Sequence, residues 1–423
     1  MLDNLRYWWE NLDKKKFFGA VTVLTVIIGL GFVIYLIWRP ERPSSPTNVN
    51  LPGESGFPIG APGGVNVAEP GEITLPSTEG VTPPPSGGEL PPVIASGGIT
   101  LTAVVNDQAT AFPVFSGSAV RYYDPRECGF YEITGDGQRA ALTDAAYCSV
   151  NNMTWSPNTT GAVLEFPDGS NVVYDFRTKK QYSLPREMEN FSWSPDSGKI
   201  AGKFMGDDLG DRWVVTVNSD GSALTGVEPM GDNADKVNVE WSPNNQVIAL
   251  SRTGEPSGAF TQQVLLVGFN QENFKGLYID GRGFQPKWTP DGKRLLYSVF
   301  NDKTNFKPSL WLADAAPDRV GLNKQNLNLA TWADKCNFSG SYAYCAVPTN
   351  LPDGSGLVRE LANGAPDSLW RVDLTTGAIN ILATPVADDG QGLTAANITI
   401  SADAKWLYFT DSDGKLRSVK LQE

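Results

Sequence analysis

Short apolar runs alternate with polar turns from residue 98 to the end of the chain, and one phrase recurs within that alternation. It reads WSPDSGKIA from Trp193 to Ala201. Related copies read WSPN at 155–158 and 241–244, WTPDGK at 288–293 and WADK at 332–335. A catalytic motif is needed once in a chain, so the repetition indicates a structural unit.

Each copy of the phrase opens a unit with the pattern of four short strands. An aromatic strand ends at the Ser-Pro turn, apolar runs such as KIAGKF and RWVVTV follow, and a turn such as NSDG leads into the last run. Asp-Gly turns between alternating apolar runs are hairpin signals, because glycine supplies the positive φ that tight turns require. Four antiparallel strands per unit predict a β-propeller blade.

The residue before each turn serves as the anchor of its unit, and we interpret the anchors as structural side chains that wedge between neighbouring blades. The anchors are Phe115, Trp155, Trp193, Trp241, Trp288, Trp332 and Ile400. The last unit has only three apolar runs, and residues 99–105 (ITLTAVV) alternate suitably to supply a fourth. The sequence therefore predicts an all-β, seven-bladed propeller whose last blade is closed by the N-terminal strand.

The repeat resembles that of TolB-like propellers, in which the W-S-P-D phrase is followed by a hairpin. The best matches are Trp193, Pro195, Asp196, Lys199 and Ile200, together with the copy at 288–293. The resemblance covers about residues 98–423 and implies the fold rather than a function, since propellers include enzymes, lectins and scaffolds. TolB-like proteins are soluble and carry a separate N-terminal domain, which the N-terminal part of this chain does not resemble.

Residues 17–38 form an uncharged apolar run, long enough to cross a ~30 Å hydrocarbon layer as a helix. A buried core helix and a cleaved signal peptide are the alternatives, but the run is long and no small-residue cleavage site follows it directly. Arg6 and residues 14–16 (KKK) precede the run, so the positive-inside rule places residues 1–16 in the cytoplasm. We therefore predict a single-pass anchor in the cell (inner) membrane that contacts lipid through residues 17–38.

Residues 39–97 are rich in proline and glycine and predict a disordered linker. Residues 98–423 then form the propeller on the outer side of the membrane, in the periplasm or at the cell surface. All four cysteines lie in this exported part, and we predict two disulfides, Cys128–Cys148 and Cys336–Cys345. A metal site made of the four thiolates is the alternative, although no C-x-x-C pair is present.

The amino-acid composition argues against several classes of binding and catalysis. The formal net charge is −13 and no long basic run is present, which argues against nucleic-acid binding. The chain has no histidine, so Ser-His-Asp and Cys-His catalysis and histidine-ligated zinc are excluded, and no G-x-S-x-G motif appears. We therefore expect no enzyme activity and no cofactor. Calcium bound by Asp-rich loops is the alternative, but none of those loops has EF-hand spacing.

The connections between second and third strands are the long ones, at 205–211, 252–261, 300–308 and 349–367. They share one face of a propeller with the blade-to-blade connections, and elaborated loops on a rigid scaffold commonly bind ligands. The candidate binding residues on this face are Asp207, Asp208, Arg212, Arg252, Lys303, Lys307, Arg359 and Glu360. We expect a non-catalytic protein-interaction module or scaffold in a cell-envelope or surface-appendage assembly. The alternative is a propeller that binds or cleaves cell-wall or external glycans with acids at its axis.

Overall fold

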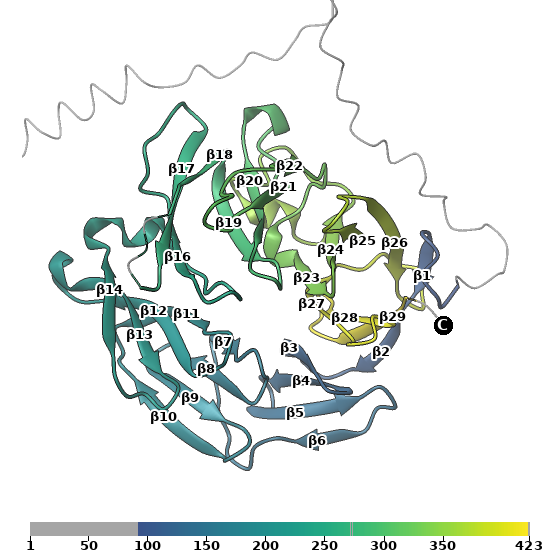
Figure 1. The fold of residues 1–423 in the computed structure, drawn as a ribbon. Coiled ribbons are helices and arrows are strands. Elements are labelled where there is room, and N and C mark those ends of the chain that lie inside the picture. The colour runs from purple at the N-terminus through teal and green to yellow at the C-terminus, as the bar shows by residue number, and fades with distance from the viewer. Residues whose placement is uncertain (1–91, 271, 273, 422–423) are drawn as a thin grey trace, which may run out of the picture. The chain divides into compact units, whose positions relative to one another are not determined.

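A computed structural model describes residues 92–421 except 271 and 273, and these residues form a seven-bladed β-propeller (Figure 1). The predicted stub at 1–16, the predicted membrane span at 17–38 and nearly all of the predicted linker lie outside the described residues. Within the described ranges, no helix has the length and apolarity needed to cross a membrane.

Each blade is an antiparallel sheet whose strands follow one another from the axis outward. Blade 1 contains β3 (Ala111–Ser116), β4 (Ala119–Asp124), β5 (Gly129–Thr134) and β6 (Arg139–Ala141). Blade 2 contains β7 (Asn152–Trp155), β8 (Gly161–Glu165), β9 (Asn171–Asp175) and β10 (Lys180–Leu184). Blade 3 contains β11 (Met188–Trp193), β12 (Lys199–Met205), β13 (Arg212–Asn218) and β14 (Thr225–Pro229). Blade 4 contains β15 (Val237–Val239), β16 (Val247–Ser251), β17 (Thr261–Gly268) and β18 (Leu277–Asp280). Blade 5 contains β19 (Arg282–Trp288), β20 (Arg294–Phe300), β21 (Ser309–Asp314) and β22 (Gln325–Asn326). Blade 6 contains β23 (Cys336–Ser339), β24 (Tyr342–Pro348), β25 (Asp367–Asp373) and β26 (Ile379–Val386). Blade 7 contains β27 (Ala396–Ile400), β28 (Trp406–Thr410) and β29 (Leu416–Lys420).

Short 3-10 helices lie only in connections of the described chain. They are η1 (Leu209–Asp211), η2 (Gly231–Lys236), η3 (Asp302–Thr304), η4 (Ala333–Lys335) and η5 (Arg359–Ala362).

The N-terminal strands close the ring, as the sequence predicts, but they do so across two blades. β2 (Ala103–Asn106) pairs antiparallel with β29 and completes blade 7. β1 (Ile99–Leu101) instead pairs parallel with β26, so it adds a fifth strand to blade 6. The expectation that all of residues 99–105 belong to the last blade is therefore wrong for residues 99–101. Thr102 makes the crossing, and its hydroxyl donates to Val386 O at 3.0 Å and accepts from Arg417 Nη1 at 3.1 Å.

The repeated phrase forms a hydrogen-bonded hairpin turn. Ser194 Oγ donates to Asp196 Oδ1 at 2.6 Å, and Lys199 N donates back to Ser194 Oγ at 2.8 Å. The same hydroxyl-to-Asx bond recurs in Ser156–Asn158, Ser242–Asn244, Thr289–Asp291 and Ser401–Asp403. The phrase is repeated because in these five blades it fixes the turn between the first and second strands.

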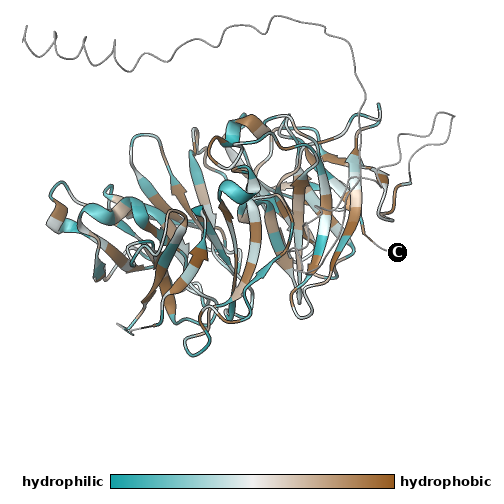
Figure 2. Ribbon diagram, turned by 90° about the horizontal axis from the view of Figure 1, so that it is seen from above, coloured by the Kyte–Doolittle hydropathy of each residue, from teal (hydrophilic) through white to brown (hydrophobic). Residues whose placement is uncertain are grey.

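Apolar residues fill the gaps between blades. Each of the seven hydrophobic clusters joins two adjacent blades, including the gap between blades 7 and 1. Trp193 lies in the cluster between blades 2 and 3, and Trp288 lies in the cluster between blades 4 and 5. Figure 2 shows hydrophobic segments running along the strands and hydrophilic ones in many of the connections. The core is therefore distributed around the ring, so neighbouring blades stabilise one another.

The sixth anchor differs from the expectation. Trp332 precedes η4 and lies before β23 rather than at its end. Phe338 occupies the anchor position, since Phe338 pairs with Ala343 in the same way as Phe115 pairs with Val120. The phrase WADK resembles the turn in sequence, but its Ala-Asp-Lys part forms a 3-10 turn in the connection between blades.

Candidate functional site: the loop face and the axis

The four long connections join second to third strands, as predicted. They comprise residues 206–211, 252–260, 301–308 and 349–366, in blades 3, 4, 5 and 6 respectively. Because strand direction alternates within a blade, these loops emerge at the same end of the propeller as the blade-to-blade connections. We call this end the loop face.

The long loops of blades 5 and 6 are joined to each other. Gly354 N donates to Asn305 O at 2.9 Å, and Gly356 N donates to Phe306 O at 2.7 Å. Lys307 Nζ and Asp353 Oδ1 form an ion pair at 3.1 Å. A Cβ on Gly356 would lie 2.6 Å from Phe300 Cβ, so only glycine permits this approach. The two loops therefore form one braced surface, which we call the ridge (residues 301–308 and 349–366).

Apolar side chains are exposed on the ridge around η5. Leu357, Val358 and Leu361 are 59%, 48% and 49% exposed. The blade 4 loop adds an aromatic contact, because the rings of Phe260 and Phe306 lie 6.1 Å apart. Three neighbouring loops thus present large apolar groups on one braced surface.

The structure separates the eight predicted binding residues into three places. Lys303, Lys307, Arg359 and Glu360 lie on the ridge. Lys303 pairs with Asp280 at 3.6 Å, while Arg359 pairs with Asp334 at 2.8 Å and lies 4.7 Å from the Trp332 ring. Trp332, expected as an anchor, therefore supports a loop-face arginine.

Asp207, Asp208 and Arg212 belong to the separate loop of blade 3. Asp207 lines an open groove of about 660 Å³ together with Phe204 and Trp213. Arg212 begins β13, and its Nε donates to Gly206 O at 3.4 Å. Arg252, the eighth residue, lies in neither place and follows β16 directly.

In four blades the side chain of the residue before the anchor forms a hydrogen bond with the backbone of the next blade. Thr399 Oγ1 accepts from Phe115 N at 3.0 Å, and Ser192 Oγ accepts from Trp241 N at 2.9 Å. Asn337 Nδ2 donates to Ile398 O at 2.8 Å. These side chains connect the inner strands around the axis.

Glu240 and Lys287 occupy the same position in blades 4 and 5, and they are the charged members of this set. Lys287 Nζ donates to Cys336 O at 2.5 Å, whereas the Glu240 carboxylate has no hydrogen bond or ion pair among the described residues. Burial raises the pKa of Glu240 to about 7, although the Lys287 ammonium opposes the shift. Burial lowers the pKa of Lys287, against the attraction of Glu240 and Asp334. The axis thus holds a carboxyl group that changes charge near neutral pH.

Sequence reasoning missed this pair, although a signal was present. The residue before the anchor is Thr154, Ser192 or Thr399 in three copies, and it becomes Glu240 or Lys287 in the VEW and PKW copies.

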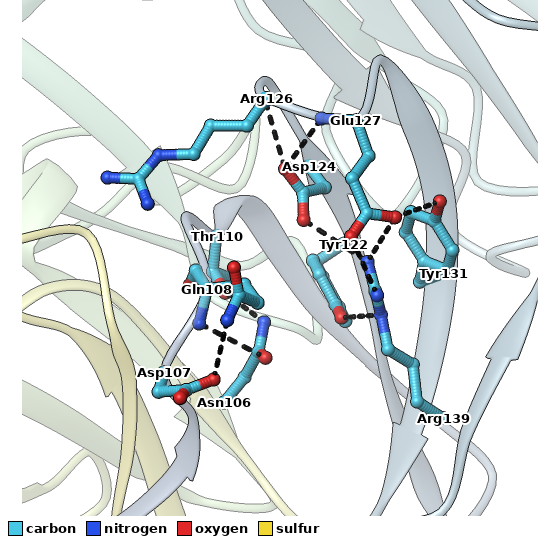
Figure 3. Close-up of polar contacts among 10 residues, drawn as sticks. All are labelled: Asn106, Asp107, Gln108, Thr110, Tyr122, Asp124, Arg126, Glu127, Tyr131 and Arg139. Atoms are coloured by element: carbon cyan, nitrogen blue, oxygen red, sulfur yellow. Dashed lines mark hydrogen bonds and ion pairs between the residues drawn. The ribbon is translucent and has the colours of Figure 1, made fainter.

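A second polar cluster lies on the loop face of blade 1 and is fully paired. Figure 3 shows Arg139 reaching past Tyr122 toward Asp124 and Glu127. Its Nε donates to Tyr122 Oη at 2.8 Å, its Nη1 to Glu127 Oε1 at 3.0 Å and its Nη2 to Asp124 Oδ2 at 3.1 Å. Since this guanidinium already has protein partners, the cluster fixes the β4–β5 turn.

Both predicted disulfides are present, Cys128–Cys148 and Cys336–Cys345. The first joins the β4–β5 turn to the segment after β6, and the second joins paired residues of β23 and β24. No group of three or more acidic, cysteine or histidine residues within the described chain is arranged to hold a metal ion.

No family model matches the chain, and no curated protein matches it. Solved structures that resemble it include an oligogalacturonate lyase in complex with manganese, at 16% identity and TM-score 0.49 over 76% of this chain and 91% of that one. Another is an oligogalacturonate lyase from Vibrio parahaemolyticus, at 11% identity and TM-score 0.48 over 78% and 92%. The β-propeller domain of Cps50 (Swd1) from Myceliophteria thermophila is similar at 12% identity and TM-score 0.48 over 76% and 100%.

These likenesses concern the fold alone, and membership of the TolB-like family stays a prediction. They do correct the expectation that the chain is not an enzyme. That expectation relied on the missing histidine and the missing hydrolase motif, whereas the solved propellers of similar fold include lyases.

Proposed function

We propose that this protein is anchored by residues 17–38 in the cell membrane, displays its propeller on the outer side and binds a protein partner through the ridge. The uncharged run and its basic N-terminal flank support the anchor. Two disulfides in the propeller support an oxidising compartment.

The observation that carries the proposal is the exposure of Leu357, Val358 and Leu361 on a surface that is already braced. Hydrogen bonds and an ion pair between the two loops hold this surface in place. Contiguous exposed apolar groups rimmed by charges are typical of protein interfaces. A pre-ordered surface also loses less conformational entropy when a partner binds.

Affinity purification of the full membrane protein, followed by partner identification, tests the proposal. Leu357→Ser combined with Leu361→Ser should abolish recovery of the partner, because interface energy is concentrated in a few buried apolar residues. Leu322→Ser is the matched control, since Leu322 is 51% exposed but lies in the β21–β22 connection on the opposite face. Equal partner recovery from the double variant and the control would overturn the proposal.

The axis supports a second candidate, a propeller that acts on glycans through an axial acid. Glu240 favours it, since this carboxyl group has no partner among the described residues and its pKa lies near neutral. Turnover of an external or cell-wall polysaccharide that Glu240→Gln abolishes, while the double ridge variant retains it, would support this candidate over the first.

A further inference from the structure

An apolar groove opens to solvent on blade 3 and is separate from the ridge. Its volume is about 660 Å³. The apolar lining comes from the end of β12, from β13 and from the residue before β14, and it consists of Phe204, Trp213, Val215 and Leu224. β13 and β14 lie across the ring from β24 and β25, the strands on either side of the longest ridge loop (Figure 1).

A hydrogen bond and a glycine fix the shape of this groove. Trp213 Nε1 donates to Gly210 O at 2.9 Å, which holds the indole ring against the β12–β13 loop. A Cβ on Gly206 would lie 2.5 Å from Asp211 Cβ, so only glycine lets the two ends of this loop approach so closely. The aromatic lining and the loop beside it are therefore ordered before a ligand binds, which lowers the entropic cost of binding.

Three carboxylates complete the lining and give the groove a negative charge. They belong to Glu187, Asp207 and Asp211, which are all exposed. None of these carboxylates forms an ion pair or a hydrogen bond within the part of the chain that the structure describes. Arg212, the cation of this loop, does not line the groove, and its Nε donates to Gly206 O. An apolar lining edged by carboxylates is complementary to a cation on an apolar stem.

The hydrogen-bonding groups of the lining favour a cation over a sugar. Ionised carboxylates only accept hydrogen bonds, and the Trp213 indole, the only side-chain donor among the described lining residues, already donates to Gly210 O. A sugar hydroxyl both donates and accepts, so these side chains would satisfy only half of its hydrogen bonding. Lysine and arginine side chains only donate, and aromatic rings attract both cations. Arginine is the better match, because its planar guanidinium stacks on aromatic rings and pairs with carboxylates through two N–H groups.

We propose that this groove binds an arginine side chain of a protein partner. Phe204 and Trp213 contact the guanidinium and its methylene stem, while the Asp207 and Asp211 carboxylates accept hydrogen bonds from its N–H groups. The groove is as large as pockets that enclose whole ligands, so residues next to the arginine also enter it. The site goes beyond the proposed function, because the ridge can bind its partner whether or not the groove is occupied.

The test uses the full-length protein in detergent and a fluorescent, capped pentapeptide of alternating alanine and arginine. The same peptide with citrulline in place of arginine is the matched control, since citrulline keeps the shape of the side chain and lacks its charge. Fluorescence anisotropy should show that the arginine peptide binds ~10-fold or more tightly than the citrulline peptide and that added sodium chloride weakens its binding. Equal binding of the two peptides, or displacement of the arginine peptide by the neutral sugar cellopentaose, would overturn the proposal.

Asp207→Asn combined with Asp211→Asn should weaken binding of the arginine peptide by about 10-fold, because it removes two charges and keeps the side-chain shapes. Both residues are exposed, so this variant should fold. Glu228→Gln combined with Asp232→Asn is the matched control, since these residues are also exposed but do not line the groove. The control should bind the peptide as the wild type does. An equal loss in both variants would indicate general attraction to an acidic surface and refute the groove.

Trp213→Leu tests the aromatic part of the site. It should weaken binding of the arginine peptide several-fold, because leucine keeps an apolar wall but lacks the ring that attracts a cation. Trp213 also packs against the cluster between blades 2 and 3, so the melting temperature of this variant is measured alongside. If the variant unfolds, the double aspartate variant carries the test. A folded Trp213→Leu protein that binds the peptide as the wild type does would contradict the stacked guanidinium.

Discussion

Trp193 Nε1 donates a hydrogen bond to the carbonyl oxygen of Thr154 at 2.9 Å, which ties an anchor of blade 3 to the inner strand of blade 2. The bond repeats between Trp155 and Phe112 O at 2.8 Å and between Trp288 and Glu240 O at 3.2 Å. The anchors therefore combine apolar packing with a polar link to the preceding blade.

Trp193→Phe should lower the free energy of unfolding by about 1 kcal/mol, because it removes this hydrogen bond and retains most of the ring. Trp193→Ala should cost about 3–5 kcal/mol, since it also leaves a cavity between the blades. Urea unfolding measures both values. Trp406→Phe is the control, as no hydrogen bond of the Trp406 indole is present in the described structure; an equal loss there would show that ring size alone matters.

The turn aspartates should make the propeller sensitive to acid. Hydrogen bonds from the Ser194 hydroxyl and the Gly198 amide hold the pKa of Asp196 below its ordinary value. Burial alone would raise the pKa of Asp291, but hydrogen bonds that include one from the Thr289 hydroxyl outweigh it, so this pKa is lowered too. Because the folded pKa is depressed, this stabilisation is present above the unfolded value of about 3.8 and is lost as pH falls through the lower folded pKa.

Replacing both aspartates by asparagine tests that dependence. Asn158 and Asn244 accept the same hydroxyl bond in blades 2 and 4, so the double variant should retain the turns at pH 7. Its melting temperature should fall less than that of the wild type between pH 5 and pH 2 (about the range over which carboxylates titrate). Parallel curves for the two proteins would contradict the prediction.

The two disulfides should be reduced in a fixed order. Cys336 and Cys345 are 1% and 0% exposed, whereas Cys148 is exposed. Thiol–disulfide exchange requires access of the attacking thiolate to a sulfur atom. Mild dithiothreitol should therefore cleave Cys128–Cys148 in the folded protein and leave Cys336–Cys345 intact, as mass spectrometry after alkylation would show. Simultaneous loss of both would mean that blade 6 opens readily.

The two N-terminal strands should contribute differently to closure. Removal of residues 1–101 deletes β1 but keeps β2, so blade 7 should stay complete and unfolding should stay cooperative. Removal of residues 1–106 also deletes β2, which leaves β29 as an open edge. That variant should aggregate and unfold over a broader range of urea. Removal of residues 1–91 is the control, and similar behaviour of all three proteins would contradict the assigned roles.

Glu240 should make stability fall as pH rises. Its folded pKa of about 7 lies above the ordinary value of 4.5, so the folded state holds an extra proton between these values. The resulting loss of stability between pH 4.5 and 7 is up to about 3 kcal/mol. Glu240→Gln should remove this slope in urea unfolding, whereas Glu228→Gln, on an outer strand, should not. An unchanged slope in Glu240→Gln would place the pKa near its ordinary value.

The blade count was predictable because local turn chemistry marks each blade, and both disulfides were predictable because each joins cysteines close together in the repeat. Ring closure was predictable only in part, since β2 completes blade 7 as expected but β1 joins blade 6. The error at Trp332 came from relying on one version of the phrase. The four letters FSGS occur at 115–118 and again at 338–341, and this exact repeat marks Phe338 as the sixth anchor. In blades 1 and 6 the turn lacks the Asx residue, so the copy differs from the dominant pattern.

The charged groups at the axis and between blades were less predictable. Glu240 is distinguishable by its register, but its raised pKa depends on burial by neighbouring blades. Lys203 lies in an ordinary strand sequence, and only the packing of blade 4 against blade 3 makes it a buried cation. Such features arise from contacts between units, which the pattern within one unit does not encode.

The path of the chain into the propeller determines which contacts bear a mechanical load. A pull applied before Pro92 first reaches the hydrogen bonds from Ala95 N to Lys420 O and from Gly97 N to Leu382 O, each 2.8 Å long. It reaches β1 next, and only then β2, the strand that keeps blade 7 closed. The contacts of residues 95–101 therefore precede β2 along the chain, so a pull from the N-terminal side would break them before it opened the ring.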